Sequence, residues 1–83
     1  MIAPGIKVYP NPLDGGYLYI QLPGNKNQNL ELIISDVYGK TIYTNLLKPG
    51  SNEINLGELN KGLYFVTVLK ENKLLLNKKI LKI

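Results

Sequence analysis

The run that decides the fold is Gly62-Leu63-Tyr64-Phe65-Val66-Thr67-Val68-Leu69, because it is the most β-like segment of the chain. β-Branched and aromatic residues favour strands, whose successive side chains point to opposite faces. Both faces of this run are largely apolar: Tyr64, Val66 and Val68 share one, and Leu63, Phe65, Thr67 and Leu69 share the other. The run therefore predicts a strand covered on both sides, or a central strand at an interface.

Short alternating runs separated by turn-forming residues continue on both sides of this segment. Glu71-Asn72-Lys73 predicts a tight hairpin turn leading into a last strand. In the run from Tyr17 to Leu22, we expect Leu18, Ile20 and Leu22 on the core face, with Tyr17, Tyr19 and Gln21 on the solvent face. The expected strands are residues 6–9, 17–22, 30–37, 41–47, 52–56, 62–69 and 74–83.

These patterns predict the fold class. No segment holds a 3.6-residue period long enough for a helix, and turn signals recur every ~8 to 12 residues, so the chain is expected to be all-β. An immunoglobulin-like antiparallel β-sandwich of about seven short strands is the first architecture. A small open barrel is the alternative, because alternation alone does not separate the two. With 83 residues, 45% of them hydrophobic and 19% charged, the chain is expected to form one small folded module.

The composition excludes most catalytic chemistry. The chain has no histidine and no cysteine, which excludes Ser-His-Asp and Cys-His nucleophiles, thiolate or imidazole zinc sites and haem attachment. A lysine-based or carboxylate-pair mechanism stays formally open, but no sequence feature pairs the six acids, which are Asp14, Glu31, Asp36, Glu53, Glu58 and Glu71. We therefore expect no enzyme, no catalytic, metal-binding or cofactor-binding residue, and no cofactor. No apolar run reaches 18 residues, so no direct membrane insertion is expected.

The net charge of +4 lies at one end of the chain. Residues 1–69 carry five lysines and five acids, whereas residues 70–83 carry five lysines and Glu71 alone. One interpretation is an edge strand that lysines protect from aggregation. The other is an exposed basic strip, which includes Lys78, Lys79 and Lys82 and docks a partner or an anionic surface. Nucleic acid is not expected as that partner, because arginine is absent and no aromatic residue lies among these lysines.

Three short motifs have structural interpretations. Tyr9-Pro10-Asn11-Pro12 predicts a stiff exit from the first strand, since each proline fixes its own φ and restricts the preceding residue. Asp36 and Gly39 predict a hairpin turn in which the carboxylate accepts backbone amides and the glycine has a positive φ. Gly62-Leu63-Tyr64 resembles the tyrosine corner of Greek-key sandwiches, in which the hydroxyl bonds to upstream backbone.

In chain order, Tyr9-Pro10-Asn11-Pro12, Leu18-x-Ile20, Asp36-x-x-Gly39-Lys40, Leu59-x-x-Gly62-x-Tyr64 and Lys78-Lys79-Ile80-Leu81-Lys82 carry a resemblance. Together they look like the type A C-terminal sorting domain of the type IX (Por) secretion system of Bacteroidetes. The resemblance covers residues 6–83. Residues 1–5 are then the remnant of a linker, with Met1 as an added start. Lysine replaces arginine throughout, and Ile83 follows the last lysine.

The resemblance implies a non-catalytic secretion signal at the C-terminus of a larger cargo protein. Such a domain is recognised in the periplasm by the outer-membrane translocon, is usually removed by a sortase-like peptidase, and leaves its cargo on the cell surface or in the medium. The segment expected to meet the machinery is Lys78, Lys79, Ile80, Leu81 and Lys82, whose strand could add to a receptor sheet if its edge is free.

A different class of function stays open. An immunoglobulin-like accessory module that binds carbohydrate or cell-surface components would need exposed aromatic residues, which Tyr17 and Tyr19 could supply. The chain has no tryptophan to support them.

Overall fold

The computed structural model describes residues 5–24 and 29–83 as seven strands and no helix. The strands are β1 Lys7–Tyr9, β2 Tyr17–Gln21, β3 Leu30–Ser35, β4 Thr41–Leu46, β5 Ser51–Asn55, β6 Gly62–Lys70 and β7 Lys73–Lys82. Each lies within two residues of its predicted bounds, so the all-β prediction is confirmed. Within the described ranges, no helix is long and apolar enough to cross a membrane.

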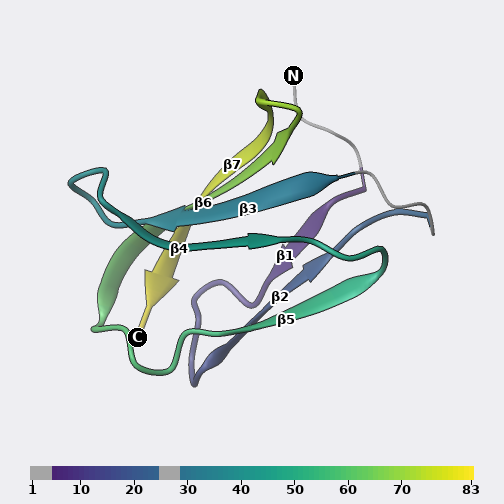
Figure 1. The fold of residues 1–83 in the computed structure, drawn as a ribbon. Coiled ribbons are helices and arrows are strands. Elements are labelled where there is room, and N and C mark those ends of the chain that lie inside the picture. The colour runs from purple at the N-terminus through teal and green to yellow at the C-terminus, as the bar shows by residue number, and fades with distance from the viewer. Residues whose placement is uncertain (1–4, 25–28) are drawn as a thin grey trace.

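The strands form the two layers of a small sandwich (Figure 1). Sheet A has the order β1-β2-β5, and sheet B has the order β4-β3-β6-β7. All ladder pairs are antiparallel. The chain changes sheet between β2 and β3, between β4 and β5, and between β5 and β6. The architecture is therefore the expected immunoglobulin-like β-sandwich rather than an open barrel.

The core lies between the two sheets and follows from the alternation of each strand. Leu18 and Ile20 of β2 are fully buried, and Leu22 just beyond that strand is also buried, as predicted. Sheet B contributes Leu30, Leu32, Ile34, Val66, Val68 and Ile80 from its inner face. Burying each such side chain stabilises the fold by about 1.5–3 kcal/mol.

Strand β6 is a central strand with only one face in the core. It pairs with β3 on one side and β7 on the other, so the prediction of a central strand is confirmed. Val66 and Val68 are fully buried, but Leu63 on the opposite face is exposed and Phe65 is only half-buried. The prediction of cover on both sides is wrong for the described residues, because sheet A packs against one face of sheet B only.

One side of the sandwich is closed by the segment that follows β1. The Leu13 N–H donates to the Leu81 carbonyl at 2.7 Å, and the Ile83 N–H donates to the Leu13 carbonyl at 3.0 Å. The Asn11 side-chain amide donates to the Lys79 carbonyl at 3.0 Å and accepts the Leu81 N–H at 3.2 Å. Leu13 itself is buried, so this contact is anchored in the core.

Candidate functional site

The five residues Lys78 to Lys82 alternate between the two faces of β7. Register with β6 places Lys78, Ile80 and Lys82 on the inner face and Lys79 and Leu81 on the outer face. Lys79 and Leu81 are exposed, Lys78 is half-buried, and Ile80 is buried. Lys82 is only 8% exposed. The expectation of three exposed lysines therefore holds for Lys79 only, because Lys78 and Lys82 share the inner face of Ile80, where Lys78 is half-buried and Lys82 is buried.

Two of these lysines join parts of the fold. The Lys82 ammonium donates to the carbonyls of Gly57 at 3.3 Å and Leu59 at 2.5 Å, in the connection between β5 and β6. The Lys78 ammonium donates to the Val8 carbonyl of β1 at 3.4 Å, from one sheet to the other. A buried charge is costly unless it is hydrogen-bonded, so these carbonyls allow Lys78 and Lys82 to lie on the inner face.

The backbone edge of β7 is partly occupied. Strand β7 is an edge of sheet B, but Asn11 and Leu13 already hydrogen-bond to its backbone edge between Lys79 and Ile83. The condition set for adding to a receptor sheet, a free edge, is therefore not met between Lys79 and Ile83. Strand addition is restricted to the part of β7 before Lys79.

The turn between β3 and β4 is built as the sequence predicts. The Asp36 carboxylate accepts the backbone N–H groups of Tyr38 and Lys40, both at 2.9 Å, and Gly39 has a φ of 84°. This hydrogen-bonded tip holds Val37 and Tyr38 outward, and Tyr38 is 92% exposed. Sequence reasoning treated the turn as structural only and missed these two side chains. The signal for an exposed aromatic side chain was Tyr38 itself, which lies in the turn between Asp36 and Gly39, where no position belongs to the core.

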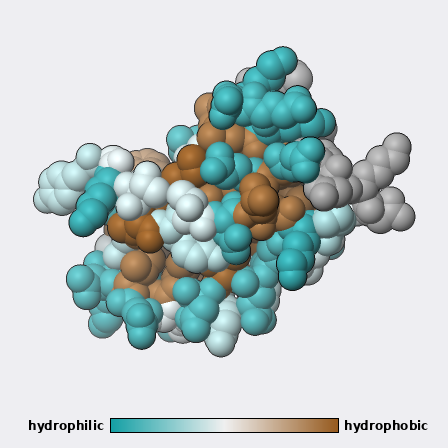
Figure 2. Space-filling view, viewed as in Figure 1, coloured by the Kyte–Doolittle hydropathy of each residue, from teal (hydrophilic) through white to brown (hydrophobic). Residues whose placement is uncertain are grey.

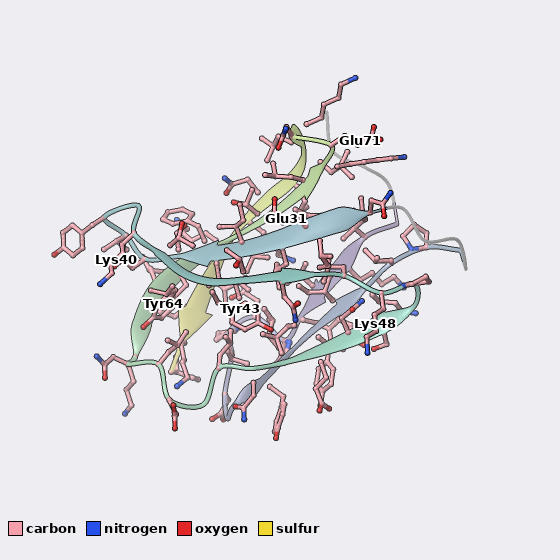
Figure 3. The ribbon with its side chains drawn as sticks, viewed as in Figure 1. Glu31, Lys40, Tyr43, Lys48, Tyr64 and Glu71 are labelled. Atoms are coloured by element: carbon pink, nitrogen blue, oxygen red, sulfur yellow. The ribbon has the colours of Figure 1, made fainter. Side chains whose placement is uncertain are left out.

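Tyr64 forms the predicted tyrosine corner. Its hydroxyl donates to the Asn60 carbonyl at 2.6 Å, and its half-buried ring packs against the core (Figure 3). The corner fixes the connection that also holds Leu59, one of the two carbonyl partners of Lys82. Tyr64 is therefore a structural residue that helps to position the end of β7.

Tyr64→Phe should lower the free energy of unfolding by about 0.5–1.5 kcal/mol. The substitution removes one hydrogen bond, while water can still reach the Asn60 carbonyl at this partly exposed corner. Urea denaturation measures the change. Tyr38→Phe is the matched control, and its highly exposed side chain should leave stability unchanged; an equal loss in the two variants would contradict the corner.

A groove of about 330 Å³ lies on the opposite side of the sandwich from Asn11 and Leu13. It is lined by Ile42, Tyr43, Asn55, Leu56, Glu58 and Leu59, from β4 and from the end of β5 onward (Figure 3 labels Tyr43). Glu58 is its one carboxylate. Within residues 5–24 and 29–83, no three His, Cys, Asp or Glu side chains gather where they could hold a metal ion.

The outer face of sheet A carries three tyrosines. Tyr9 pairs in register with Tyr19, and their rings stack with centroids 5.5 Å apart. Tyr9 and Tyr17 are exposed, and Tyr19 is half-buried. Desolvation of the hydroxyl and the Glu53 carboxylate on β5 raise the pKa of Tyr19 above its ordinary value. Tyr19 is thus less solvent-facing than predicted, whereas Tyr17 lies as predicted.

Comparison with known protein families gives one match that covers nearly the whole chain. A family model described as the secretion system C-terminal sorting domain matches residues 7–82. The chain belongs to this family of sorting domains. The family is that of type IX secretion, so the resemblance carried by the five motifs is confirmed.

One solved structure supports the fold of this sorting domain. A domain of PorZ from Porphyromonas gingivalis is similar at 22% sequence identity with a TM-score of 0.73. The match covers 95% of this chain and 11% of PorZ, which is described as an essential bacterial surface component of the type-IX secretion system. At this identity the similarity concerns the fold alone. A search of curated proteins finds no match.

Proposed function

We propose that this domain directs a larger, covalently attached cargo protein through the type IX outer-membrane translocon to the cell surface or the medium. The observation that carries the proposal is the family match, which spans residues 7–82 and so all seven strands. In this proposal residues 6–83 form the signal, residues 1–5 are the remnant of a linker, and the domain passes through the periplasm before a sortase-like peptidase removes it. Its role is recognition rather than catalysis.

The machinery is proposed to contact the outward members of the basic segment. Lys79 and Leu81 are both exposed on the outer face of sheet B, whereas Lys78, Ile80 and Lys82 hold the strand in place. The translocon would then recognise a folded surface, because unfolding would separate Lys79 and Leu81 from the sheet that presents them. An acidic group on the translocon that faces Lys79 would increase the rate at which the domain and the translocon associate.

Export of a reporter tests this function. A fluorescent protein with a Sec signal peptide, fused to this domain, should reach the medium or surface of a bacterium that has the type IX machinery. The same reporter without the domain should stay in the periplasm. Retention of the folded fusion in the periplasm would contradict the proposed function.

Two charge reversals in this fusion separate recognition from general charge. Lys79→Glu should slow export without unfolding the domain, because its side chain makes no hydrogen bond or ion pair with the described residues. Lys48→Glu makes the same charge change in the turn before β5, away from β7, and should leave export unchanged. Equal export of the two variants would remove Lys79 from the recognition surface.

Carbohydrate binding is a second candidate because Tyr9, Tyr17 and Tyr19 lie together on the outer face of sheet A. Gln21, Glu53 and Asn55 lie on the same face and could bond to hydroxyl groups. However, Tyr9 and Tyr19 stack on each other, which leaves Tyr17 as the open ring. Periplasmic retention of the fusion, together with oligosaccharide binding that Tyr17→Ala removes, would favour this candidate.

A further inference from the structure

The outer face of sheet B is an uncovered apolar surface. Leu46 and Leu74 are 70% and 57% exposed, and Leu63 and Leu81 are also exposed. Ile33 and Phe65 lie between them, half-buried by neighbours on the sheet but not packed against the core. Figure 2 shows apolar side chains at the surface over β3 and β4. Exposed apolar side chains that gather on one face of a domain indicate a protein interface.

Two opposite charges lie at opposite corners of this face. Ile33, Thr67 and Asn77 form one row across β3, β6 and β7. Glu31 lies two residues before this row on β3, and Lys79 lies two residues after it on β7. Because β3 and β7 are both antiparallel to β6, they run in the same direction. Thr67 therefore lies midway between Glu31 and Lys79.

Neither charged side chain is used within the domain. Glu31, labelled on β3 in Figure 3, and Lys79 make no side-chain hydrogen bond or ion pair with residues 5–24 and 29–83. The face thus presents apolar side chains around Thr67, with one unpaired positive and one unpaired negative group equally far from that residue. Such a surface is complementary to itself, which is what a two-fold symmetric contact requires.

We propose that this face binds a second copy of the same domain through a two-fold axis over Thr67. The axis runs parallel to the sheet, in the plane between the two copies. It is the perpendicular bisector of the line from Glu31 to Lys79, so each Lys79 meets Glu31 of the other copy. With strands about 4.8 Å apart and residues about 3.3 Å apart, the same rotation brings Ile33 over the other copy's Phe65. It also brings Leu46 over the other copy's Leu63 and Leu81.

The area of the face indicates a weak, reversible dimer. Four strands about 4.8 Å apart and the nine residues of β6 at about 3.3 Å each give a face of roughly 19 by 30 Å. Two copies would bury roughly 1,100 Å², near the lower limit for a specific interface. We therefore expect a reversible dimer with a dissociation constant on the order of 0.1 mM.

Sedimentation equilibrium of the chain from about 10 µM to about 1 mM tests the dimer. Lys79→Glu and Glu31→Lys should each weaken association at least about tenfold, because each places like charges together twice across the two-fold axis. The double variant should restore the wild-type constant to within about threefold, since the pair is then only reversed. Lys48→Glu is the control for net charge and should have no effect.

Two results would overturn the dimer: a monomer throughout this range, or a dimer that both single charge reversals leave unchanged. Leu46→Ser provides an apolar test, because a side chain 70% exposed contributes little to folding and its loss should weaken association about tenfold. The dimer stands independently of the proposed export function. Glu31→Lys separates the two, since it should weaken association while leaving Lys79 and Leu81 available to the secretion machinery.

Discussion

Lys82→Glu should lower the free energy of unfolding by about 3–5 kcal/mol, which is comparable to the whole stability of a domain this size. The substitution removes an ammonium that donates to the carbonyls of Gly57 and Leu59 and places a carboxylate against those oxygens. The side chain is 8% exposed, so water cannot replace the lost bonds without opening the contact between β7 and the connection before β6.

Lys79→Glu is the matched control for this prediction. It makes the same change of charge three residues earlier on the same strand, but on the exposed outer face. Its effect on stability should stay below about 1 kcal/mol. Urea denaturation followed by circular dichroism compares the two variants. Similar losses in both would show that Lys82 is not the buried structural lysine that the fold indicates.

The second large effect is expected at Asn52, a buried polar residue on β5. Its Oδ1 accepts the Lys48 N–H at 2.8 Å, and its Nδ2 lies 2.9 Å from the Lys48 carbonyl and 3.3 Å from the Ile20 carbonyl. The side chain thus holds the turn after β4 against sheet A. Asn52→Ala should destabilise the domain by about 2–4 kcal/mol, because the backbone groups lose their partner in a buried place.

Asn55→Ala, three residues along the same strand, is the control for Asn52. Asn55 is exposed and its side chain accepts the single N–H of Gly57 at 2.9 Å. Thermal unfolding should show a loss below about 1 kcal/mol for this variant. A loss at Asn55 as large as that at Asn52 would contradict the role of burial.

The positions of Lys79 and Lys82 bear on how the sorting domain can be recognised. A basic cluster in the sequence suggests one strip of charge, yet the fold divides it into internal lysines and an external one. Variants that change the whole segment would therefore combine loss of stability with loss of contact. A change at Lys79 tests contacts made by the outer face of sheet B with little effect on stability, whereas a change at Lys82 tests folding.

The sequence alone determined the strands and turns, because both depend on neighbouring residues. Period-two alternation located all seven strands, and Leu18, Ile20 and Leu22 were placed on the core face correctly. Asp36 with Gly39, and Tyr64 with its upstream backbone, were also predicted, since each bond in these motifs spans four residues or fewer.

What each face and edge of a strand contacts depends on the tertiary structure. Alternation gives β6 two apolar faces, but the layer that covers Val66 and leaves Phe65 open is sheet A, whose strands β1 and β2 are distant from β6 in the chain. Lys82 is buried because carbonyls 23 and 25 residues away receive it. Part of the edge of β7 is occupied by Asn11, which bonds to Lys79, 68 residues away. Such contacts depend on how sheets pack and which strands become neighbours, and local periodicity carries no information about either.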